Sequence, residues 1–535
     1  MTLQAVHRVE CDVAIVGSGF AGSILALILR RQGQRVALID RTRHPRFAIG
    51  ESSTPLANLL IEELADRYDL PRLRAFSKWG TWQATHPQVT CGRKRGFSFF
   101  QHTPGQPFED DASHARQMLV AASPNDAIAD THWYRPEFDH WLAHEAADAG
   151  AVLLEDTHLD APLMAGDRCV LEGTRHGARL RIDTGFVVDA SGPRGYLWRS
   201  LGLGDARLEW LPPTQAVYAH FTGVELWDQL VAGDATPPYP VDEAALHHVL
   251  PGGWIWVLRF ASGVTSAGVA GTDEFAHRYA FADGGAGWRR VLADFPSIAA
   301  QFSGAHAVTP YVHAPRVAHR TATVSGDRWA LLPSAAGVID PLLSTGFPLT
   351  LLGIGRMATL LDPAMPAADR ASGLRRYAHD TVEELRITER LVAALYGAMT
   401  DFPLFKRLAL LYFAAASYAE TVRRLGEPER ARGFLLHADP VFGPALRRIT
   451  DQARRLAAGD DDAGARRRVY DAIDAAIAPF DVAGLGDANR RSWYPVRAGD
   501  LHAARERLGV SANAIDALLA RCGFAADDAA VGVHA

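Results

Sequence analysis

A glycine-rich turn near the start of the chain carries the clearest chemical signal. It follows an apolar segment of β type (residues 13–16) and precedes an apolar run with helical spacing, and a second apolar strand ends on an acid. Such a layout binds dinucleotides because glycines let the backbone approach a pyrophosphate, the helix N-terminus favours anions, and the acid accepts from a ribose hydroxyl. We therefore expect FAD or NAD rather than NADP, the alternative being a strand–helix–strand unit without a ligand. The residues expected at this site are Gly17, Ser18, Gly19, Ala21, Gly22 and Asp40.

A second set of small and polar residues follows the acid, in the segment Gly50-Glu-Ser-Ser-Thr-Pro55. Thr54 before Pro55 is typical of a helix start, with a capping hydroxyl and a proline at the first helical position. Ligands of open α/β sheets bind at the carboxyl edge of the strands, and this loop lies at that edge. The simpler interpretation is a capped helix and nothing more. The residues expected to contact the cofactor here are Gly50, Glu51 and Ser52.

Lysine is rare in this chain, so each lysine is a candidate for chemistry. Of the 55 lysines and arginines, only Lys78, Lys94 and Lys406 are lysine. Lys94 lies in an aromatic segment, residues 91–100, which we expect to form strands leaving the first domain together with residues 78–82. A partly buried ammonium group donates hydrogen bonds, and desolvation lowers its pKa so that it can also react as an amine. The alternative is a surface strand residue between two arginines.

Two later motifs carry further candidates. Trp254 and Trp256 are two positions apart and point to the same side of an expected strand, where a tryptophan pair can fill a seam between sheet and domain. The loop Asp340-Pro-Leu-Leu-Ser-Thr-Gly346 places small residues at a helix start, where backbone N–H groups can form an anion-binding nest. The residues expected to contact cofactor or anion here are Asp340, Thr345, Gly346 and Phe347.

The composition describes an ordinary globular chain of 535 residues, 48% hydrophobic and 22% charged. A net charge of −6 gives no reason to expect nucleic acid or an acidic membrane surface as a partner. Four scattered cysteines without a CxxC fit a reducing compartment and exclude a disulfide framework. No secretory signal is evident and no apolar stretch reaches the ~20 residues of a spanning helix, so we expect a cytoplasmic protein. His140 and His144 stand four apart on an expected helix without a third ligand, so no metal site is expected.

The order of elements predicts an α/β fold: a Rossmann-like FAD-binding domain, an antiparallel-sheet substrate domain and a helical C-terminal region. Strand-like runs between 208 and 317 alternate apolar and mixed positions, and apolar residues recur with helical spacing beyond a link at 362–369. We expect a surface break at 459–464 and a frayed end at 525–535. The expected division is 1–80, 115–205 and 318–365 for the FAD-binding domain, 81–114 and 206–317 for the substrate domain, and 366–535 for the C-terminal region.

Taken together, these motifs resemble the flavin-dependent halogenases, the tryptophan-halogenase-like branch of the two-domain FAD monooxygenases. The likeness spans about residues 10–350. The glycine turn and Asp189-Ala-Ser-Gly192 are shared with very many FAD enzymes. The block Lys94-Arg-Gly-Phe-Ser-Phe99, the Trp-x-Trp motif and the loop 340–346 discriminate better.

The resemblance implies a two-component enzyme. In that family reduced FAD, delivered by a separate flavin reductase, reacts with oxygen and halide to give hypohalous acid, which reaches a lysine beside an electron-rich aromatic. Chloride or bromide would be the co-substrate, and the acceptor a phenol, pyrrole or indole, free or carrier-bound. The C-terminal helices would either cover the substrate site or form a homodimer. By this resemblance Lys94 is the catalytic lysine, Thr345 and Gly346 bind halide or only the flavin, and Trp254 and Trp256 stand near the flavin and the tunnel.

Three departures limit the likeness. Val257 and Leu258 follow the second tryptophan where the full motif has isoleucine-proline, and Pro333-Ser334 replaces a Gly-Asp that many relatives place near the ribityl chain. Leu343 stands where tryptophan halogenases have a glutamate, which argues against free tryptophan as substrate and leaves the base unassigned. Two alternatives stay open: an FAD monooxygenase or desaturase without a halide step, and a flavoprotein whose FAD is structural or sensory.

Overall fold

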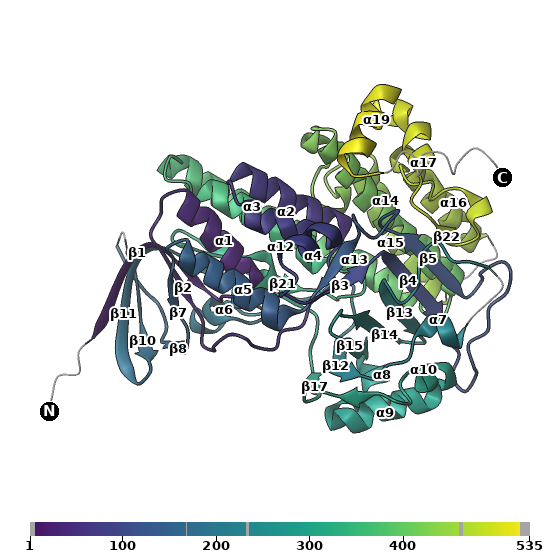
Figure 1. Ribbon diagram of the computed structural model, residues 1–535, viewed down its shortest axis with the longest axis horizontal. Helices are drawn as coiled ribbons and strands as arrows, with labels where there is room; N and C mark the ends of the chain where they lie inside the picture. Colours follow the sequence, from purple (N-terminus) through teal and green to yellow (C-terminus); the bar gives the residue numbers. More distant parts are fainter. Residues whose placement is uncertain (1–5, 167, 232–234, 460–463, 525–535) are drawn as a thin grey trace.

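The computed structural model describes residues 6–166, 168–231, 235–459 and 464–524. Figure 1 shows an elongated molecule with one large sheet toward the left, a second toward the lower right, and a helical C-terminal region above the second. The predicted α/β class with these three parts is confirmed. The predicted frayed end at 525–535, and residues 460–463 of the predicted surface break, lie outside the described residues.

The first sheet is built on parallel strands that carry the glycine turn. Its strands are β1 (His7–Val16), β2 (Val36–Ile39), β7 (Val152–Leu154), β8 (Thr157–Leu159), β9 (Leu163–Ala165), β10 (Arg168–Arg175), β11 (Ala178–Asp189), β19 (Ser325–Gly326) and β20 (Trp329–Leu331). The order β20–β11–β1–β2–β7 is parallel throughout, whereas β10 runs antiparallel to the first part of β11. Val16 lies beside Ile39 and Asp189, so three carboxyl strand ends meet where the glycine turn begins.

The second sheet is mostly antiparallel. Its strands are β4 (Gly96–Gln101), β5 (Gln117–Ala121), β12 (Thr214–Thr222), β13 (Ala245–Leu250), β14 (Gly253–Arg259), β15 (Thr265–Thr272), β16 (His306–Ala307), β17 (Val312–Ala314) and β22 (Trp493–Tyr494). Parallel pairs occur where β4 meets β13 and where β22 meets β5. Strand β5, which the predicted division assigns to the FAD-binding domain, pairs with β4 here, and β22 brings the C-terminal region into the same sheet.

Two short ribbons complete the strands. β3 (Cys91–Lys94) pairs with β6 (Asp130–Trp133), and β18 (His319–Arg320) pairs with β21 (Gly337–Val338), both antiparallel. The first ribbon matters for function because its register sets Lys94 opposite Asp130.

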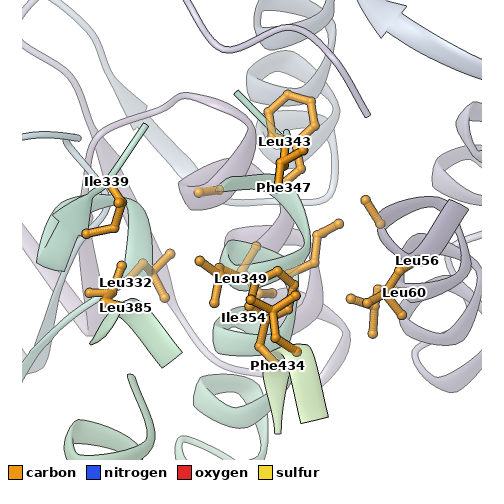
Figure 2. Packing of buried hydrophobic residues seen from close by; sticks show 14 of the residues in the cluster. Leu56, Leu60, Leu332, Ile339, Leu343, Phe347, Leu349, Ile354, Leu385 and Phe434 are labelled. Carbon is orange, nitrogen blue, oxygen red and sulfur yellow. The ribbon is translucent and has the colours of Figure 1, made fainter. Parts of the chain in front are cut away.

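Four helices frame the first sheet: α1 (Phe20–Arg31), α2 (Pro55–Arg67), α5 (Arg135–Asp148) and α12 (Gly346–Leu360). Helix α1 packs on β2 and α5 on β7, and the two helices contact each other, so both cover the same face. Thr54 caps α2 as predicted, since its hydroxyl accepts from the Ala57 N–H at 3.2 Å. Figure 2 shows Leu56 and Leu60 of α2 directed toward the apolar side chains of α12, including Leu349 and Ile354.

The remaining helices lie around both sheets and form the C-terminal region. They are α3 (Pro71–Arg74), α4 (Trp79–Thr85), α6 (Tyr196–Ser200), α7 (Trp227–Leu230), α8 (Asp273–Arg278), α9 (Gly285–Asp294), α10 (Pro296–Gln301), α11 (Pro333–Ala336), α13 (Ala367–Gly397), α14 (Phe402–Arg424), α15 (Phe442–Ala457), α16 (Ala465–Ile477), α17 (Ala498–Ala503), α18 (Arg505–Leu508) and α19 (Ala512–Arg521).

The prediction of a strand at residues 78–82 is wrong, because helix α4 begins at Trp79. Trp82 is fully buried, with its ring 4.6 Å from that of Phe76, and its indole N–H donates to the Val89 carbonyl at 2.8 Å. The aromatic composition favoured a strand, but packing in this cluster decides the local structure. The segment 91–100 does form strands, as predicted.

Candidate active site

A cavity of about 900 Å³ opens at the carboxyl edge of the first sheet and reaches the second sheet. It is large enough for a dinucleotide, and three segments far apart in sequence meet in its wall: the glycine turn, the loop 46–52 and the loop 337–347. The predicted site residues in this wall are Gly17, Gly19, Ala21, Asp40, Gly50, Glu51, Ser52, Trp254, Trp256, Asp340, Thr345, Gly346 and Phe347. Ser18, Gly22 and Lys94 lie behind the wall.

The glycine turn has the geometry that a dinucleotide requires. Gly17 has φ +106°, and a Cβ there would lie 2.5 Å from the Ala190 carbonyl. A Cβ on Gly22 would lie 1.9 Å from the Gly17 carbonyl oxygen, so both positions exclude any side chain. At Gly19 the nearest atoms are the ends of charged side chains at 3.4 Å or more, which leaves its backbone open to the cavity. Gly17 and Gly22 therefore build the turn, and Gly19 keeps its backbone accessible.

Asp40 is held ionised beside this turn. Its Oδ2 accepts from the Ser18 N–H and hydroxyl, each at 3.0 Å, and from Arg46 Nη2 at 3.1 Å. Although burial acts to raise it, the pKa of Asp40 falls to about 2 because of Arg46 and the hydrogen bonds from Ser18 and Thr42. The buried Ser18 thus orients the acid rather than facing the cavity itself.

A pair of arginines that the sequence did not single out flanks Gly19. The guanidinium groups of Arg135 and Arg46 are the nearest cations to the position of a Gly19 Cβ, at 3.5 and 3.6 Å. Asp139 fixes Arg135 with two hydrogen bonds of 2.8 and 2.7 Å, one helical turn away on α5. Two fixed cations beside an open helix N-terminus fit a pyrophosphate. In the sequence, the i, i+4 spacing of Arg135 and Asp139 was the available signal for the fixed position of Arg135.

Helix α12 also begins at the large cavity. Thr345 precedes its first residue, Gly346 is exposed, and within the described residues no side chain caps the helix. Ser344 has φ +53°, which turns the chain so that the first N–H groups of a 15-residue helix are available to an anion. Leu343 in this loop is fully buried, and as a leucine it supplies no carboxylate to the cavity. The two helix starts and the arginines are the features of this structure that fit FAD and a small anion.

The two tryptophans face the large cavity from β14, as their spacing predicts. Their rings lie 5.6 Å apart, and the Trp254 indole N–H donates to the Tyr396 hydroxyl at 3.2 Å. Tyr396 of α13 donates in turn to Asp340 Oδ2 at 2.8 Å. Burial raises the pKa of Asp340 to about 7, while hydrogen bonds from Tyr396 and Leu342 act to lower it. This chain of contacts joins the second sheet, the C-terminal region and the loop before α12.

Lys94 is completely buried, so it is not the surface strand residue of the alternative interpretation. Its Nζ donates to Ser52 Oγ at 2.8 Å and to the Ser53 carbonyl at 2.5 Å, and stands 3.8 Å from the centre of the Phe97 ring. Ser52 lines the large cavity, whereas Phe97 lines a second, smaller cavity. The ammonium group therefore lies between the two cavities, behind the wall of each.

Asp130 is the acidic neighbour of Lys94. Burial lowers the pKa of Lys94 to about 7 while Asp130 acts to raise it. Burial likewise raises the pKa of Asp130 to about 7, against the opposing charges of Lys94 and Lys78. Burial thus disfavours the charged form of both groups and brings their two pKa values toward each other.

The smaller cavity, of about 180 Å³, lies between the first sheet's helix α2, strands β4 and β5 and the C-terminal region. Its wall includes Phe97 and Asp130 together with Tyr412, Phe413 and Ala416 of α14. Residues after β22 and from α19 close the other side. A mostly apolar chamber with a few polar groups is suited to an aromatic ring.

In the part of the chain that the structure describes, the histidines and cysteines form no candidate metal site. Among residues 6–166, 168–231, 235–459 and 464–524 no group of three His, Cys, Asp or Glu side chains is arranged to hold a metal ion. His140 and His144 contact each other on α5, with ring centres 4.3 Å apart. Within the same described ranges, every helix is too short or too polar to cross a bilayer.

Comparison with known proteins agrees with this geometry. The model of the family described as FAD dependent oxidoreductase matches residues 12–349. Monodechloroaminopyrrolnitrin halogenase PrnC of Pseudomonas fluorescens is 31% identical over 404 residues, which cover 74% of this chain and 69% of that protein. Tetracycline 7-halogenase of Kitasatospora aureofaciens is 28% identical over 420 residues, covering 76% of this chain and 73% of that protein.

A solved structure shows the same fold. Halogenase PltM, determined in complex with phloroglucinol and FAD, superimposes with a TM-score of 0.80 at 22% identity, covering 90% of this chain and 99% of that chain. The resemblance inferred from the motifs and the expected cofactor are thereby confirmed. The chain belongs to the FAD dependent oxidoreductases and, among them, to the flavin-dependent halogenases, enzymes that take halide ion as co-substrate.

Proposed function

We propose that this halogenase transfers chlorine or bromine to a small electron-rich aromatic, such as a phenol, pyrrole or indole, bound beside Lys94. The observation that carries the proposal is the place of the Lys94 ammonium group. It touches Ser52 of the large cavity on one side and the Phe97 ring of the small cavity on the other. One buried donor thus stands between the cofactor chamber and a chamber suited to the acceptor, in contact with one wall residue of each.

The large cavity would hold FAD along its length. The open backbone at Gly19, with Arg46 and Arg135, would bind the pyrophosphate, and Asp40 the adenosine ribose. The first N–H groups of α12, at Thr345 and Gly346, would hold halide beside the flavin ring. When bound, reduced FAD would supply the electrons that activate oxygen, and the activated oxygen would oxidise halide to hypohalous acid.

Lys94 would act after hypohalous acid has formed. Its Nζ donates a hydrogen bond to the oxygen of the acid and directs the halogen toward the small cavity. When the ring carbon forms its bond to halogen, the halogen–oxygen bond breaks and hydroxide is released beside the ammonium group, which stabilises the charge. A lysine suits this role because burial lowers its pKa to about 7 and leaves a compact, strong donor.

The size of the small cavity favours an acceptor with a single aromatic ring. A cavity of ~150 Å³ lined by apolar side chains is enough to bind benzene, and the chamber beside Lys94 measures about 180 Å³. Phloroglucinol, the ligand of PltM, is a phenol of this size. The ring would be presented free or attached to a carrier.

The wider context of the enzyme belongs to the same proposal. We infer that a separate flavin reductase supplies reduced FAD, that the protein acts in the cytoplasm, and that its division into domains follows the predicted boundaries except at β5. A homodimer remains a prediction, which light scattering of the purified protein would test.

The Lys94→Met variant tests the proposed function. Methionine has a similar length and no charge, so we expect bromination of phenols to fall at least ~100-fold, as on loss of a group that transfers or positions a proton. FAD binding and reoxidation of reduced flavin should continue at the rate of the unmodified enzyme. Lys406→Met is the matched control, because Lys406 lies in neither cavity wall and bonds only to the loop before β5 and to Ser492.

The assay combines flavin reductase, NADH, oxygen and bromide with a panel of phenols, pyrroles and indoles. Mono-brominated products that persist in Lys94→Met would contradict the role of the lysine. Hydroxylated or dehydrogenated products without halogen, from the unmodified enzyme, would favour a monooxygenase or desaturase instead.

A further inference from the structure

Asp130 is a buried carboxylate that none of the roles above employs. It lies at the start of β6, is almost fully shielded from solvent, and lines the small cavity. Its Oδ1 accepts from Asn58 Nδ2 at 2.7 Å. Its Oδ2 has no hydrogen-bond partner among the residues that the structure describes. A buried acceptor without a partner is costly, which makes a donor on the ligand of this cavity the natural complement.

The backbone fixes Asp130 next to the lysine. β3 and β6 pair antiparallel with Lys94 directly opposite Asp130, so both side chains leave the same face of the ribbon. Directly opposed residues have Cβ atoms ~5 Å apart. The position is therefore set by strand register rather than by a mobile loop, and a ring that reaches Lys94 also reaches the carboxylate.

Other groups near the small cavity are less suited to receive a proton. Glu420 accepts from Arg424 Nε at 2.8 Å, and Glu62 from Arg424 Nη1 at 3.2 Å, so both acids are paired with the same cation. The imidazole of His132, behind the ribbon, is held neutral because burial and Lys94 lower its pKa. Asp130 combines burial, a free oxygen and contact with the chamber.

We propose that Asp130 is the catalytic base that binds the O–H or N–H group of the aromatic acceptor and takes its proton while the carbon–halogen bond forms. This inference rests on the proposed function, because it concerns the acceptor that Lys94 serves. The raised pKa of Asp130, about 7, supports the role, since the carboxylate is basic enough to share a phenol proton near neutrality.

The step balances with hypohalous acid as the oxidant. Asp130 receives the O–H proton, the oxygen electrons move into the ring, and the ortho or para carbon bonds to the halogen as the halogen–oxygen bond breaks. The hydroxide released beside Lys94 removes the proton from the halogenated carbon and becomes water. Asp130 then returns its proton to the phenol oxygen, so one aromatic C–H and one hypohalous acid give one C–X and one water.

The role predicts a preference larger than the one that hypohalous acid shows alone. Acceptors with an O–H or N–H donor conjugated to the reacting carbon should be favoured, and O-methylation should remove the advantage. The test compares a phenol with its methyl ether in the complete system with reductase, NADH and bromide, using the unmodified enzyme, Asp130→Asn and free hypobromous acid. Asparagine keeps the shape and can still accept from Asn58.

We expect the enzyme to prefer the phenol over the ether at least ~10-fold more than free hypobromous acid does. In Asp130→Asn the rate with phenol should fall ~100-fold, the rate with ether should change little, and the excess preference should vanish. Asp126→Asn is the matched control: it neutralises a partly exposed acid on the preceding loop, where Asp126 pairs with Arg93 and Arg95, and should keep the preference.

Three outcomes would overturn the inference. The first is an excess preference that survives in Asp130→Asn, and the second is an equal loss with phenol and ether, which would mean that Asp130 only positions Lys94. The third, which needs no variant, is an unmodified enzyme that shows no more preference than free hypobromous acid. An unmodified enzyme that brominates neither compound would refute the proposed function itself, so the two failures are distinguishable.

Discussion

At the scale of single residues, the glycines of the first turn separate stability from cofactor binding. An alanine at Gly22 would place its Cβ 1.9 Å from the Gly17 carbonyl oxygen, whereas at Gly19 the nearest atom is 3.4 Å away. We expect Gly22→Ala to destabilise the apoprotein by at least ~2 kcal/mol, as overpacking in a rigid site does. Gly19→Ala should leave the melting temperature of the apoprotein nearly unchanged but weaken FAD binding ~10-fold or more, because the methyl group occupies the path of the pyrophosphate.

Thermal melting of the apoprotein and titration with FAD, followed by flavin fluorescence, measure the two effects separately. Gly33→Ala is the control: Gly33 has a positive φ, +80°, and apart from its chain neighbours no described atom lies within 4 Å of its Cβ position. It should cost only the backbone strain of ~1 kcal/mol and leave FAD binding intact. Equal losses of FAD affinity in all three variants would contradict the distinction.

The sequence could single out Lys94 as a candidate but not Asp130, and the difference is physical. A lysine in a chain that otherwise uses arginine is visible by its rarity, and its aromatic neighbours indicate burial. The acid gains its position from the register of β3 on β6, which joins two segments far apart in the chain. Likewise Tyr396 reaches Asp340 only because α13 packs across the loop. Pairings made by tertiary packing leave no local pattern.

At the scale of elements, helix α13 holds the loop that starts α12 through the pair Tyr396 and Asp340. Burial raises the pKa of Asp340 to about 7, above its value in the unfolded chain of ~3.9. The folded protein therefore binds this proton more tightly, and the stability it contributes is fully present below pH ~4 and is lost as the pH rises through about 7.

Asp340→Asn isolates that contribution, because asparagine does not ionise and can still accept from Tyr396. We expect the stability of the variant relative to the unmodified apoprotein to increase between pH 5 and pH 8 by on the order of 2 kcal/mol, since one pKa unit corresponds to about 1.4 kcal/mol. Denaturant unfolding of both proteins at a series of pH values measures it. A difference that stays constant over this range would show that Asp340 titrates normally in the folded state.

Elements with strong local signals were predictable, and those decided by neighbours were not. β1, α1 and β2 follow from apolar runs and glycines, and α2 and α5 from a capping threonine and from prolines. The helix at Trp79–Thr85 was missed because its tryptophans favour a strand by composition but pack as a helix against Phe76. Strand β22 was missed because two residues have no periodicity of their own and are strands only where they meet β5.

At the scale of the whole molecule, two chambers share one wall. The large cavity belongs to the first sheet and the face of the second, whereas the small cavity is closed by α14 and by segments after residue 480. Figure 1 shows these C-terminal helices gathered at the end of the molecule away from β1 and β2. Strand β22, whose Tyr494 lines the small cavity, pairs with β5, which joins this cover to the second sheet. In the proposed mechanism this arrangement separates the place where oxidant forms from the place where it is used.

Filling the small cavity should therefore uncouple the two half-reactions. Ala416 lies on α14 and lines only this chamber, so Ala416→Phe would occupy the space of the acceptor ring without reaching the large cavity. We expect bromination of a phenol to fall at least ~10-fold, while FAD affinity and the oxygen-dependent reoxidation of reduced flavin stay unchanged, because loss of substrate fit in a packed pocket costs 1–3 kcal/mol or more. Hypobromous acid that finds no acceptor should then appear in solution, where a small diketone trap detects it.

Ala416→Ser, which adds little volume, is the matched control and should halogenate like the unmodified enzyme. If Ala416→Phe halogenated as well as the control, the acceptor would have to bind elsewhere; if it lost flavin reoxidation as well, the two chambers would not be independent.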